Sequence, residues 1–204
     1  MYIPDHFRED RPEALHDAVR RIGFATLVTS DSLGRPEANH LPMLLEAKGE
    51  RSVLRGHVAR ANPVWKQGGG EALAIFLGPH AYVSPNWYPS KAETGKVVPT
   101  WNYITVHARG VINWVQDADW LRAHVGALSN VNEAGRAQPW KIGDAPTSYL
   151  DGMLRAIVGF ELTIAKLEGK WKLSQNRDAA DYAGARDGLE RDGHGDVARL
   201  MDRH

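Results

Sequence analysis

The sequence predicts a mixed α+β protein, mainly β, in which antiparallel strands form a small barrel with helices on its outside. Two observations lead to this class. Five segments of strand character follow one another closely with short turns between them, and a sixth comes later in the chain. Helical segments lie around them without the regular strand–helix alternation that is typical of a doubly wound parallel sheet. With 204 residues, of which 43% are hydrophobic, the chain can bury a core of its own.

The first elements are a helix and two strands. Residues 11–21 carry apolar side chains at helical spacing, with a proline in the first turn, where a helix tolerates it. Gly23 ends this pattern. Residues 24–30 and 38–45 are rich in β-branched and apolar side chains, with a turn between them. We therefore expect one amphipathic helix followed by an antiparallel strand pair.

Two more strands complete the first half. A turn at residues 48–50 leads into a third strand at 52–58. Residues 63–67 predict a short helical turn, because the preceding Asn62 is a good N-cap and proline suits the first helical position. After three glycines, a fourth strand is expected at 72–77, followed by a proline-rich loop over residues 78–99.

The second half continues with a long strand, two helices and a last strand. Residues 100–115 alternate between two faces, with Ile, Val and Ala on one side. Helical periods return at 117–134 and 146–156. The alternation of 158–164 predicts the sixth strand, which we expect to end in a turn at 168–170.

The last part of the chain is polar and of helical character from about residue 177. From Lys170 to His204 it contains seven basic and seven acidic residues, so it is not a nucleic-acid-binding arm. We expect a single domain over residues 1–204 with a helical C-terminal extension.

Charge and cysteine content exclude several classes of function. The 25 Lys and Arg residues equal the 25 Asp and Glu residues, so no net charge favours a nucleic acid or a membrane surface. The absence of cysteine excludes Cys nucleophiles, thiolate metal sites and disulfides. The sequence opens without a basic and apolar leader, and no apolar run reaches membrane-spanning length. We therefore expect a cytoplasmic protein without a membrane partner.

One basic segment, residues 51–116, differs from this balance. It carries seven Lys and Arg residues against two acidic ones. Such an excess is equally typical of a solvated surface. However, Arg60 follows a strand at the point where Asn62 starts the helical turn, so a guanidinium and free backbone N–H groups would meet there. This combination favours a phosphate, and Gly56 would let a ligand approach the strand backbone.

Other chemistry-bearing residues give weaker indications. Four histidines lie on strands or strand ends without the spacing of metal ligands, so no metal site is predicted: His40, His57, His80 and His107. No serine lies in the sequence context of a hydrolase nucleophile. Two interpretations remain for a tryptophan at a strand end, such as Trp101. Its ring packs in a protein core or interface, or it borders a flat aromatic ligand. The aromatic residues between 87 and 103 have more apolar surface than a single barrel can bury. We therefore expect a second copy of the chain to bury them in a dimer.

Several longer runs of this sequence carry a resemblance to known proteins: residues 40–42, 56–63, 76–82, 96–103 and 169–177. They resemble one family, the PaiB-type FMN-binding negative transcriptional regulators. The family is similar to the flavin-binding split barrels, which include pyridoxamine phosphate oxidase and flavin reductases. The resemblance implies a six- to seven-stranded antiparallel split β-barrel and a homodimer that holds FMN at its interface.

The resemblance also implies a cofactor site of eleven residues: Arg55, Gly56, His57, Arg60, Ala61, Asn62, Trp101, Asn102, Lys172, Ser174 and Gln175. By this likeness the first three line the cofactor and the next three meet its phosphate. The tryptophan and asparagine lie near the flavin ring, from the same or the other subunit, and the last three close the site. Where the family carries a Thr-x-x-His-Glu run, this chain has Ser, Asn, Val, Asn and Glu at 129–133, so no catalytic residue is assigned.

Three functions are consistent with these observations. The first is an FMN-binding split-barrel homodimer with a role in negative regulation of transcription, as the resemblance implies. The alternative is an FMN-dependent oxidoreductase of the flavin reductase or oxidase type that acts on a small molecule. A haem-handling protein on the same fold is the third. Because the sequence has no helix-turn-helix signature and no basic arm, we do not expect direct DNA binding, and regulation would act through a partner or a metabolite.

Overall fold

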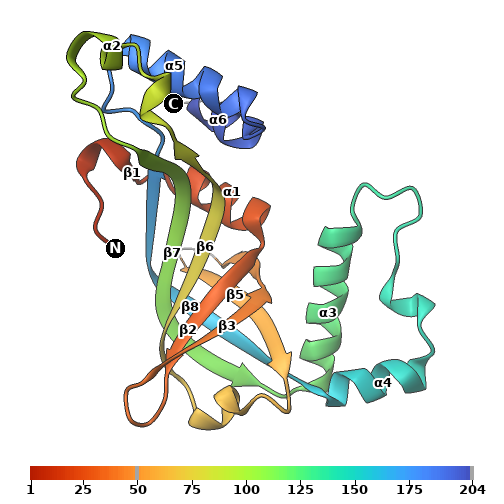
Figure 1. Cartoon of the computed structure of the whole chain (residues 1–204). Helices are drawn as coiled ribbons and strands as arrows, with labels where there is room; N and C mark the ends of the chain where they lie inside the picture. Colours follow the sequence, from red (N-terminus) through yellow and green to blue (C-terminus); the bar gives the residue numbers. More distant parts are fainter. Residues whose placement is uncertain (49–50, 203–204) are drawn as a thin grey trace. The chain divides into compact units, whose positions relative to one another are not determined.

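The computed structural model describes residues 1–48 and 51–202 and contains one eight-stranded sheet (Figure 1). Its strand order is β3-β2-β6-β7-β8-β5-β4, with β1 paired to β8. Where the register is known, neighbouring strands are antiparallel. The predicted class is confirmed: a mixed α+β fold with an antiparallel sheet and peripheral helices. Residues 49 and 50 of the predicted turn lie outside the described residues.

The strands have the following bounds: β1 (Arg8–Glu9), β2 (Phe24–Ser30), β3 (Pro36–Pro42), β4 (Leu44–Lys48), β5 (Arg51–Ala59), β6 (Gly70–Val83), β7 (Thr100–Val115) and β8 (Ile157–Lys172). The α-helices are α1 (Pro12–Ile22), α2 (Ser90–Thr94), α3 (Ala118–Glu133), α4 (Thr147–Arg155), α5 (Ala179–Arg191) and α6 (Gly195–Met201). The 3-10 helices are η1 (Asp5–Phe7), η2 (Pro63–Gln67), η3 (Pro85–Trp87) and η4 (Ile142–Asp144).

The described chain forms two compact units. The first contains residues 1–18, 76–107 and 168–204, and the second contains 19–75 and 108–167. The long strands β6, β7 and β8 each contribute residues to both units. The expectation of a single domain stays a prediction.

The predicted strand at 38–45 is two strands, β3 and β4, which separate at Met43. The backbone N–H of Met43 donates to the carbonyl oxygen of Gly23 at 2.8 Å. Its side chain is only 2% exposed. Gly23 has a φ of +63°, which glycine adopts without strain. The end of α1 therefore fixes the point at which the chain changes from one strand to the next.

Strand β6 continues beyond the predicted end at residue 77, so the predicted loop begins too early. Ala81 and Val83 are 1% and 0% exposed, and they alternate with exposed Tyr82. Pro79 removes one backbone donor from the strand, but the burial of these two residues continues the pattern of a half-buried strand beyond it. The 3-10 helix η3 and helix α2 occupy part of the remaining proline-rich segment.

Strand β8 also runs past its predicted end, because residues 168–170 form part of the strand rather than a turn. A Cβ atom on Gly169 would lie 2.3 Å from Cδ2 of Leu15 and 2.6 Å from the ring of Trp171. Glycine is therefore present here for close packing. A sequence pattern does not distinguish this use of glycine from a turn.

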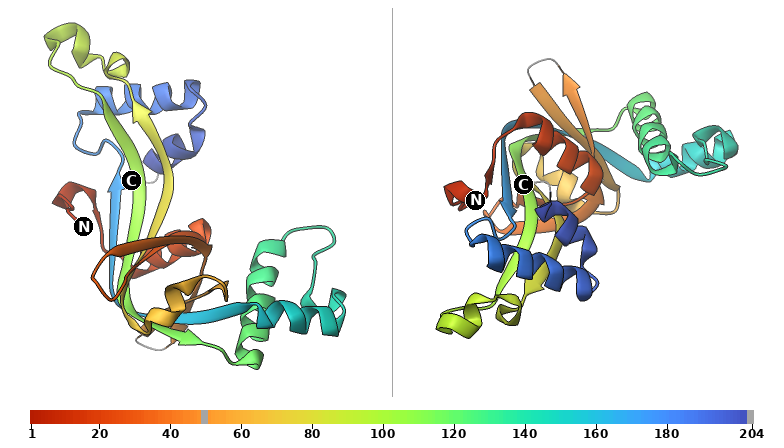
Figure 2. Two further views of the ribbon diagram at one scale, coloured as in Figure 1. Left: turned by 60° about the horizontal axis from the view of Figure 1, so that its bottom comes forward. Right: turned by 90° about the horizontal axis from the view of Figure 1, so that it is seen from above.

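Helices α1, α3 and α4 match the ranges predicted from helical periodicity. In the second unit, Leu121 of α3 packs with Leu150 and Leu154 of α4 in a small cluster. Helices α3 and α4 lie side by side in both views of Figure 2, and so do α5 and α6 of the first unit. The tail helices α5 and α6 confirm the helical character predicted after residue 177. None of the helices in the described parts of the chain has the length and apolar character needed to cross a membrane.

Candidate functional site

Arg55, in the body of β5, is held by carboxylates of the two neighbouring strands. Its Nε donates to Oε1 of Glu161 on β8 at 2.9 Å, and its Nη1 donates to Oε1 of Glu46 on β4 at 2.5 Å. The guanidinium also lies 5.4 Å from the ring centre of Trp120. Its side chain is 20% exposed. The positive charge of Arg55 is therefore compensated within the protein.

Gly56 makes room for an aromatic ring. A Cβ atom on this residue would lie 2.4 Å from Cζ of Phe160, its direct partner on β8. No side chain fits there unless the ring moves. The Phe160 ring therefore fills the space beside Gly56 that we expected a ligand to use.

His57 belongs to a buried histidine pair. Its Nδ1 lies 3.1 Å from Nε2 of His124 on α3, and the His124 ring stacks on Trp120 with centres 5.1 Å apart. Burial lowers the pKa of His57. Burial, and then the charges of His57 and Arg55, lower the pKa of His124 to about 4. Both rings are therefore neutral at pH 7.

The tautomer of this pair follows from one unpartnered atom. Nδ1 of His124 is buried and has no hydrogen-bond partner within the described structure. A buried lone pair costs less than a buried N–H without an acceptor, so we assign the proton of His124 to Nε2, which then donates to His57. Sequence reasoning missed His124. The available signal was its position four residues after Trp120, on the same face of a helix.

Arg60, at the exit of β5, makes only contacts with neutral groups. Its Nε donates to the carbonyl oxygen of Arg155 at 2.7 Å, its Nη1 to Oε1 of Gln116 at 2.7 Å, and its Nη2 to the carbonyl oxygen of Ile157 at 3.0 Å. Among the described residues it forms no ion pair with a carboxylate. A guanidinium has five N–H groups, so two remain. Arg60 thus ties the start of β8 to β5 and keeps an uncompensated charge.

Arg60 also lines a pocket of about 420 Å³ in the second unit. Two further arginines of this pocket are Arg122 and Arg155, and its acidic residues are Asp119 and Asp151. Arg122 and Asp151 form an ion pair with each other. The charged lining residues are therefore positive in sum, with Arg60 among the cations that can meet an anion.

Ala61 and Asn62 form the turn after β5. The predicted N-cap is confirmed, because Oδ1 of Asn62 accepts from the backbone N–H of Val64 at 3.0 Å. Its Nδ2 donates to Oδ1 of Asn39 at 2.6 Å. Ala61 is exposed. The Asn62 side chain therefore shapes the turn, and any contact of this turn with a phosphate would come from its backbone.

In the first unit, the end of β8 meets the start of β7 around Asn102. Asn102 is fully buried, and its Oδ1 accepts from Oγ of Ser174 at 3.1 Å. Its Nδ2 lies 3.6 Å from the sulfur of Met201. Ser174 has a φ of +66°, and no other non-glycine residue in the described parts of the chain has a positive φ. These contacts hold the backbone turn after β8 in a strained conformation.

Lys172 and Gln175 complete this cluster. Nζ of Lys172 donates to the carbonyl oxygen of Trp101 at 2.6 Å and to Oγ1 of Thr100. Burial, followed by the charges of two neighbouring cations, lowers the pKa of Lys172. The Gln175 side chain bonds to the backbone of two preceding residues, accepting from the N–H of Leu173 at 2.7 Å and donating to the carbonyl oxygen of Trp171 at 2.6 Å. The segment thus stabilises itself and the position of Trp101.

Trp101 itself is 52% exposed. Its ring centre lies 6.1 Å from that of His80 and 6.2 Å from that of Tyr82, on the neighbouring strand β6. These three rings form an exposed aromatic group in the first unit. By contrast, Tyr88 is 2% exposed and already buried within its own chain, and Trp87 packs against α5 at Gly188.

The structure thus places the predicted site residues in two groups. One group lies along β5 and its exit, in the second unit, and consists of Arg55, Gly56, His57, Arg60, Ala61 and Asn62. The other lies at the start of β7 and the end of β8, in the first unit, and consists of Trp101, Asn102, Lys172, Ser174 and Gln175.

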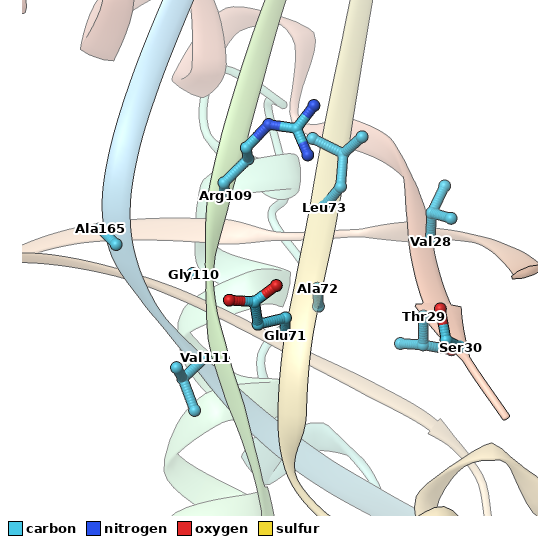
Figure 3. Close-up of a pocket in the computed structure, with 10 residues that line it drawn as sticks. All are labelled: Val28, Thr29, Ser30, Glu71, Ala72, Leu73, Arg109, Gly110, Val111 and Ala165. Atoms are coloured by element: carbon cyan, nitrogen blue, oxygen red, sulfur yellow. The ribbon is translucent and has the colours of Figure 1, made fainter. Parts of the chain in front are cut away.

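A second pocket, of about 340 Å³, lies on strands β2, β6, β7 and β8 in the second unit (Figure 3). Glu71 and Arg109 project from the neighbouring strands β6 and β7 in this close-up. Their opposite charges balance, so the pocket has no preference for an anion. None of the predicted site residues lines it.

Comparisons with known proteins add to this geometry. A family model described as "Putative FMN-binding domain" matches residues 1–166. The chain is 34% identical over 184 residues to "Protease synthase and sporulation protein PAI 2" of Bacillus subtilis, covering 89% of this chain and 86% of that protein. It is 35% identical over 188 residues to the uncharacterized protein AN0679 of Emericella nidulans, covering 76% and 75%.

Two solved structures share the fold. The flavocytochrome Anf3 from Azotobacter vinelandii has a TM-score of 0.61 at 14% identity, covering 89% of this chain and 78% of that one. The FAD and heme binding protein from Mycobacterium smegmatis has a TM-score of 0.60 at 18% identity, covering 87% and 79%. At these identities the likeness supports the fold and nothing more specific.

Proposed function

The chain belongs to the family described as "Putative FMN-binding domain", and from this premise we propose that it binds FMN as a split-barrel homodimer. Its similarity to the Bacillus subtilis PAI 2 protein and its resemblance to PaiB-type regulators support a role in negative regulation of transcription. That role acts through a partner or a metabolite, since the chain has no net charge with which to attract DNA. The cytoplasmic location stays a prediction.

The observation that carries the proposal is the state of Arg60. FMN differs from riboflavin by a phosphate that is charged at pH 7, and a phosphate is best held by a guanidinium with free donors. Arg60 has two N–H groups left and no carboxylate partner among the described residues. The residues at the exit of β5 therefore fit a phosphate. Arg60, Ala61 and Asn62 would hold it, with the two last contributing through their backbone.

The flavin ring needs flat apolar contacts, and the exposed ring of Trp101 can offer them. The cluster of Asn102, Lys172, Ser174 and Gln175 keeps this tryptophan in place through the backbone of β7 and of the turn after β8. In this proposal these residues border the flavin ring. Covering the exposed side of Trp101 in this way also removes apolar surface from water.

A second candidate is an FMN-dependent oxidoreductase of the flavin reductase or oxidase type. The resemblance to flavin-binding split barrels, which include flavin reductases, leaves this alternative open. When bound, FMN supplies the electron transfer that such a reaction needs. In this chain His57 lies in the first group of predicted residues, and both His57 and its partner His124 are neutral at pH 7. His57 can hold a hydrogen bond to a ligand without adding a charge.

Absorption and fluorescence titrations of the purified full-length chain test the proposal. We expect saturable binding of FMN at one molecule per chain and a mass of two chains in light scattering. Binding of haem in place of flavin, or binding of neither, would contradict it. Oxidation of NADH or NADPH by the FMN-loaded protein would favour the oxidoreductase, and its absence would favour the regulator.

A further inference from the structure

The largest volume among the pockets described for this chain, about 570 Å³, lies in the second unit. Its walls are the end of α1, the break between β3 and β4, and the C-terminal half of α3. A volume of this size is typical of small-molecule sites. None of the eleven residues implied for FMN lines it. The pocket therefore needs an explanation of its own.

Most of its lining is apolar and partly open to solvent. Phe24 and Val131, from β2 and α3, are 57% and 59% exposed although both face this pocket. Leu128 lies one helical turn before Val131 on the same face of α3. Large apolar side chains from two elements that converge on a concave site are typical of ligand contacts.

The charged residues that line this pocket are all basic. Arg20 and Arg21, in the last turn of α1, both line the pocket. Arg20 has other interactions in the protein, so Arg21 is the cation that can receive a ligand. Arg21 forms no hydrogen bond or ion pair with the described residues. An uncompensated cation beside apolar walls favours a ligand that carries both an anionic group and an apolar body.

The wall next to the arginines is fixed before any ligand binds. The N–H of Gly23 donates to the carbonyl oxygen of Val19 at 2.9 Å, and the carbonyl oxygen of Gly23 accepts from Met43 at 2.8 Å. The first bond closes the end of α1, and the second connects it to the break between β3 and β4. Binding therefore does not require this part of the chain to become ordered, which lowers the entropic cost of association.

We infer that this pocket binds a small organic anion with an aromatic or aliphatic body, such as a hydrophobic carboxylate, sulfonate or phosphate ester. Arg21 receives the anionic group, and Phe24, Leu128 and Val131 contact the apolar part. The site is distinct from the residues implied for FMN. In a regulator that acts through a metabolite, it gives the protein a place for an effector.

Two fluorescent probes of matched shape test this inference on the full-length protein. The first is 8-anilino-1-naphthalenesulfonate, and the second is N-phenyl-1-naphthylamine, which has the same aromatic body without the sulfonate. The variants are Arg21→Gln and Val131→Asp, both at exposed positions that the fold tolerates. Arg199→Gln is the matched control, an exposed arginine in the last turn of α6 that lines none of the pockets described above.

We expect the wild type to bind one molecule of either probe. Arg21→Gln should weaken binding of the sulfonate probe about fivefold or more, which corresponds to the loss of one exposed charge contact. It should change the affinity for the neutral probe less than about twofold. Val131→Asp should weaken both, and Arg199→Gln neither. Unchanged binding in Arg21→Gln and Val131→Asp would overturn the inference.

Two further outcomes would assign the pocket to another occupant and so also overturn it. If Val131→Asp halves the mass in light scattering, the pocket is a surface covered by a second copy. If FMN displaces the sulfonate probe, and Arg21→Gln weakens FMN as much as it weakens that probe, the pocket is the flavin site. FMN binding that is unchanged in Arg21→Gln supports the two separate sites.

Discussion

The body of β5 and its exit each carry an arginine, and the two have opposite environments. Arg55, in the body, donates to two carboxylates, while Arg60, five residues later, donates to two backbone carbonyls and one amide oxygen. Both side chains are well bonded. Only the nature of the acceptors distinguishes them, and it leaves Arg60 with a net charge that an anion can still use.

The rest of the strand follows the same division. In the body, Gly56 makes room for Phe160, and His57 pairs with a buried neutral histidine. At the exit, the chain turns away from the sheet and Ala61 is exposed. The comparison indicates that the body of β5 serves the fold and that its exit serves the ligand. The following predictions test each half of this statement.

The largest expected effect concerns His124 and acid. Its pKa of about 4 in the folded state lies below the value of about 6.5 of an unfolded histidine. Its contribution to stability is therefore fully present above pH 6.5 and is lost as the pH falls toward 4, because the unfolded chain takes up the proton first. Between pH 7 and 4.5 the wild type should lose more free energy of unfolding than His124→Gln does. We expect the difference between the two losses to be roughly 2–3 kcal/mol.

Urea unfolding at the two pH values measures this difference. His194→Gln, an exposed histidine before α6, is the control and should keep the acid dependence of the wild type. Equal acid dependence in His124→Gln and the wild type would mean that the buried site of His124 beside β5 admits a charged histidine.

The next effect concerns the ion pairs of Arg55. Arg55→Met removes this cation from the half-buried carboxylates of Glu46 and Glu161, which lie on the two strands that flank β5. We expect a loss of roughly 2 kcal/mol in the free energy of unfolding, below the value for a fully buried pair because water still reaches the carboxylates. Urea unfolding of this variant beside Arg199→Gln measures it. A loss no larger than that of Arg199→Gln would show that Arg55 is not structural.

A comparable or smaller effect is expected at Gly56. Gly56→Ala places a methyl group against the ring of Phe160 and should cost about 1–2 kcal/mol of stability. Because the clash is with that ring, the double variant Gly56→Ala/Phe160→Leu should lose less free energy of unfolding than the two single variants lose together. Strict additivity in this double-mutant cycle would contradict the assignment of Gly56 to packing.

Local patterns of the sequence were sufficient for many elements of the fold. The bounds of β2, β7 and η2 agree with the predicted ranges, because alternation, capping and glycine breaks are local signals. The extension of β6 to Val83 and the passage of β8 through Gly169 could not be predicted. Both depend on burial against segments that are distant in the sequence.

The same limit applies to the candidate site. The sequence predicted that Arg55 and Arg60 lie on one strand and at its exit, and that Asn62 caps the following turn. It could not show that Arg55 meets Glu161, which lies 106 residues away, or that Arg60 meets only neutral acceptors. Charge compensation is a property of the assembled sheet, so residue type alone does not separate a structural arginine from one that binds a ligand.

The most direct test of the central claim compares these two arginines in their selectivity between FMN and riboflavin. Both flavins are titrated into apo wild type, Arg60→Ala and Arg55→Met by fluorescence, at a temperature where all three are folded. We predict that Arg60→Ala weakens FMN on the order of tenfold and riboflavin less than twofold, because only FMN carries the phosphate. Arg55→Met should leave the ratio of the two affinities unchanged. Equal losses for both flavins in Arg60→Ala, or a selective loss of FMN in Arg55→Met, would contradict the account.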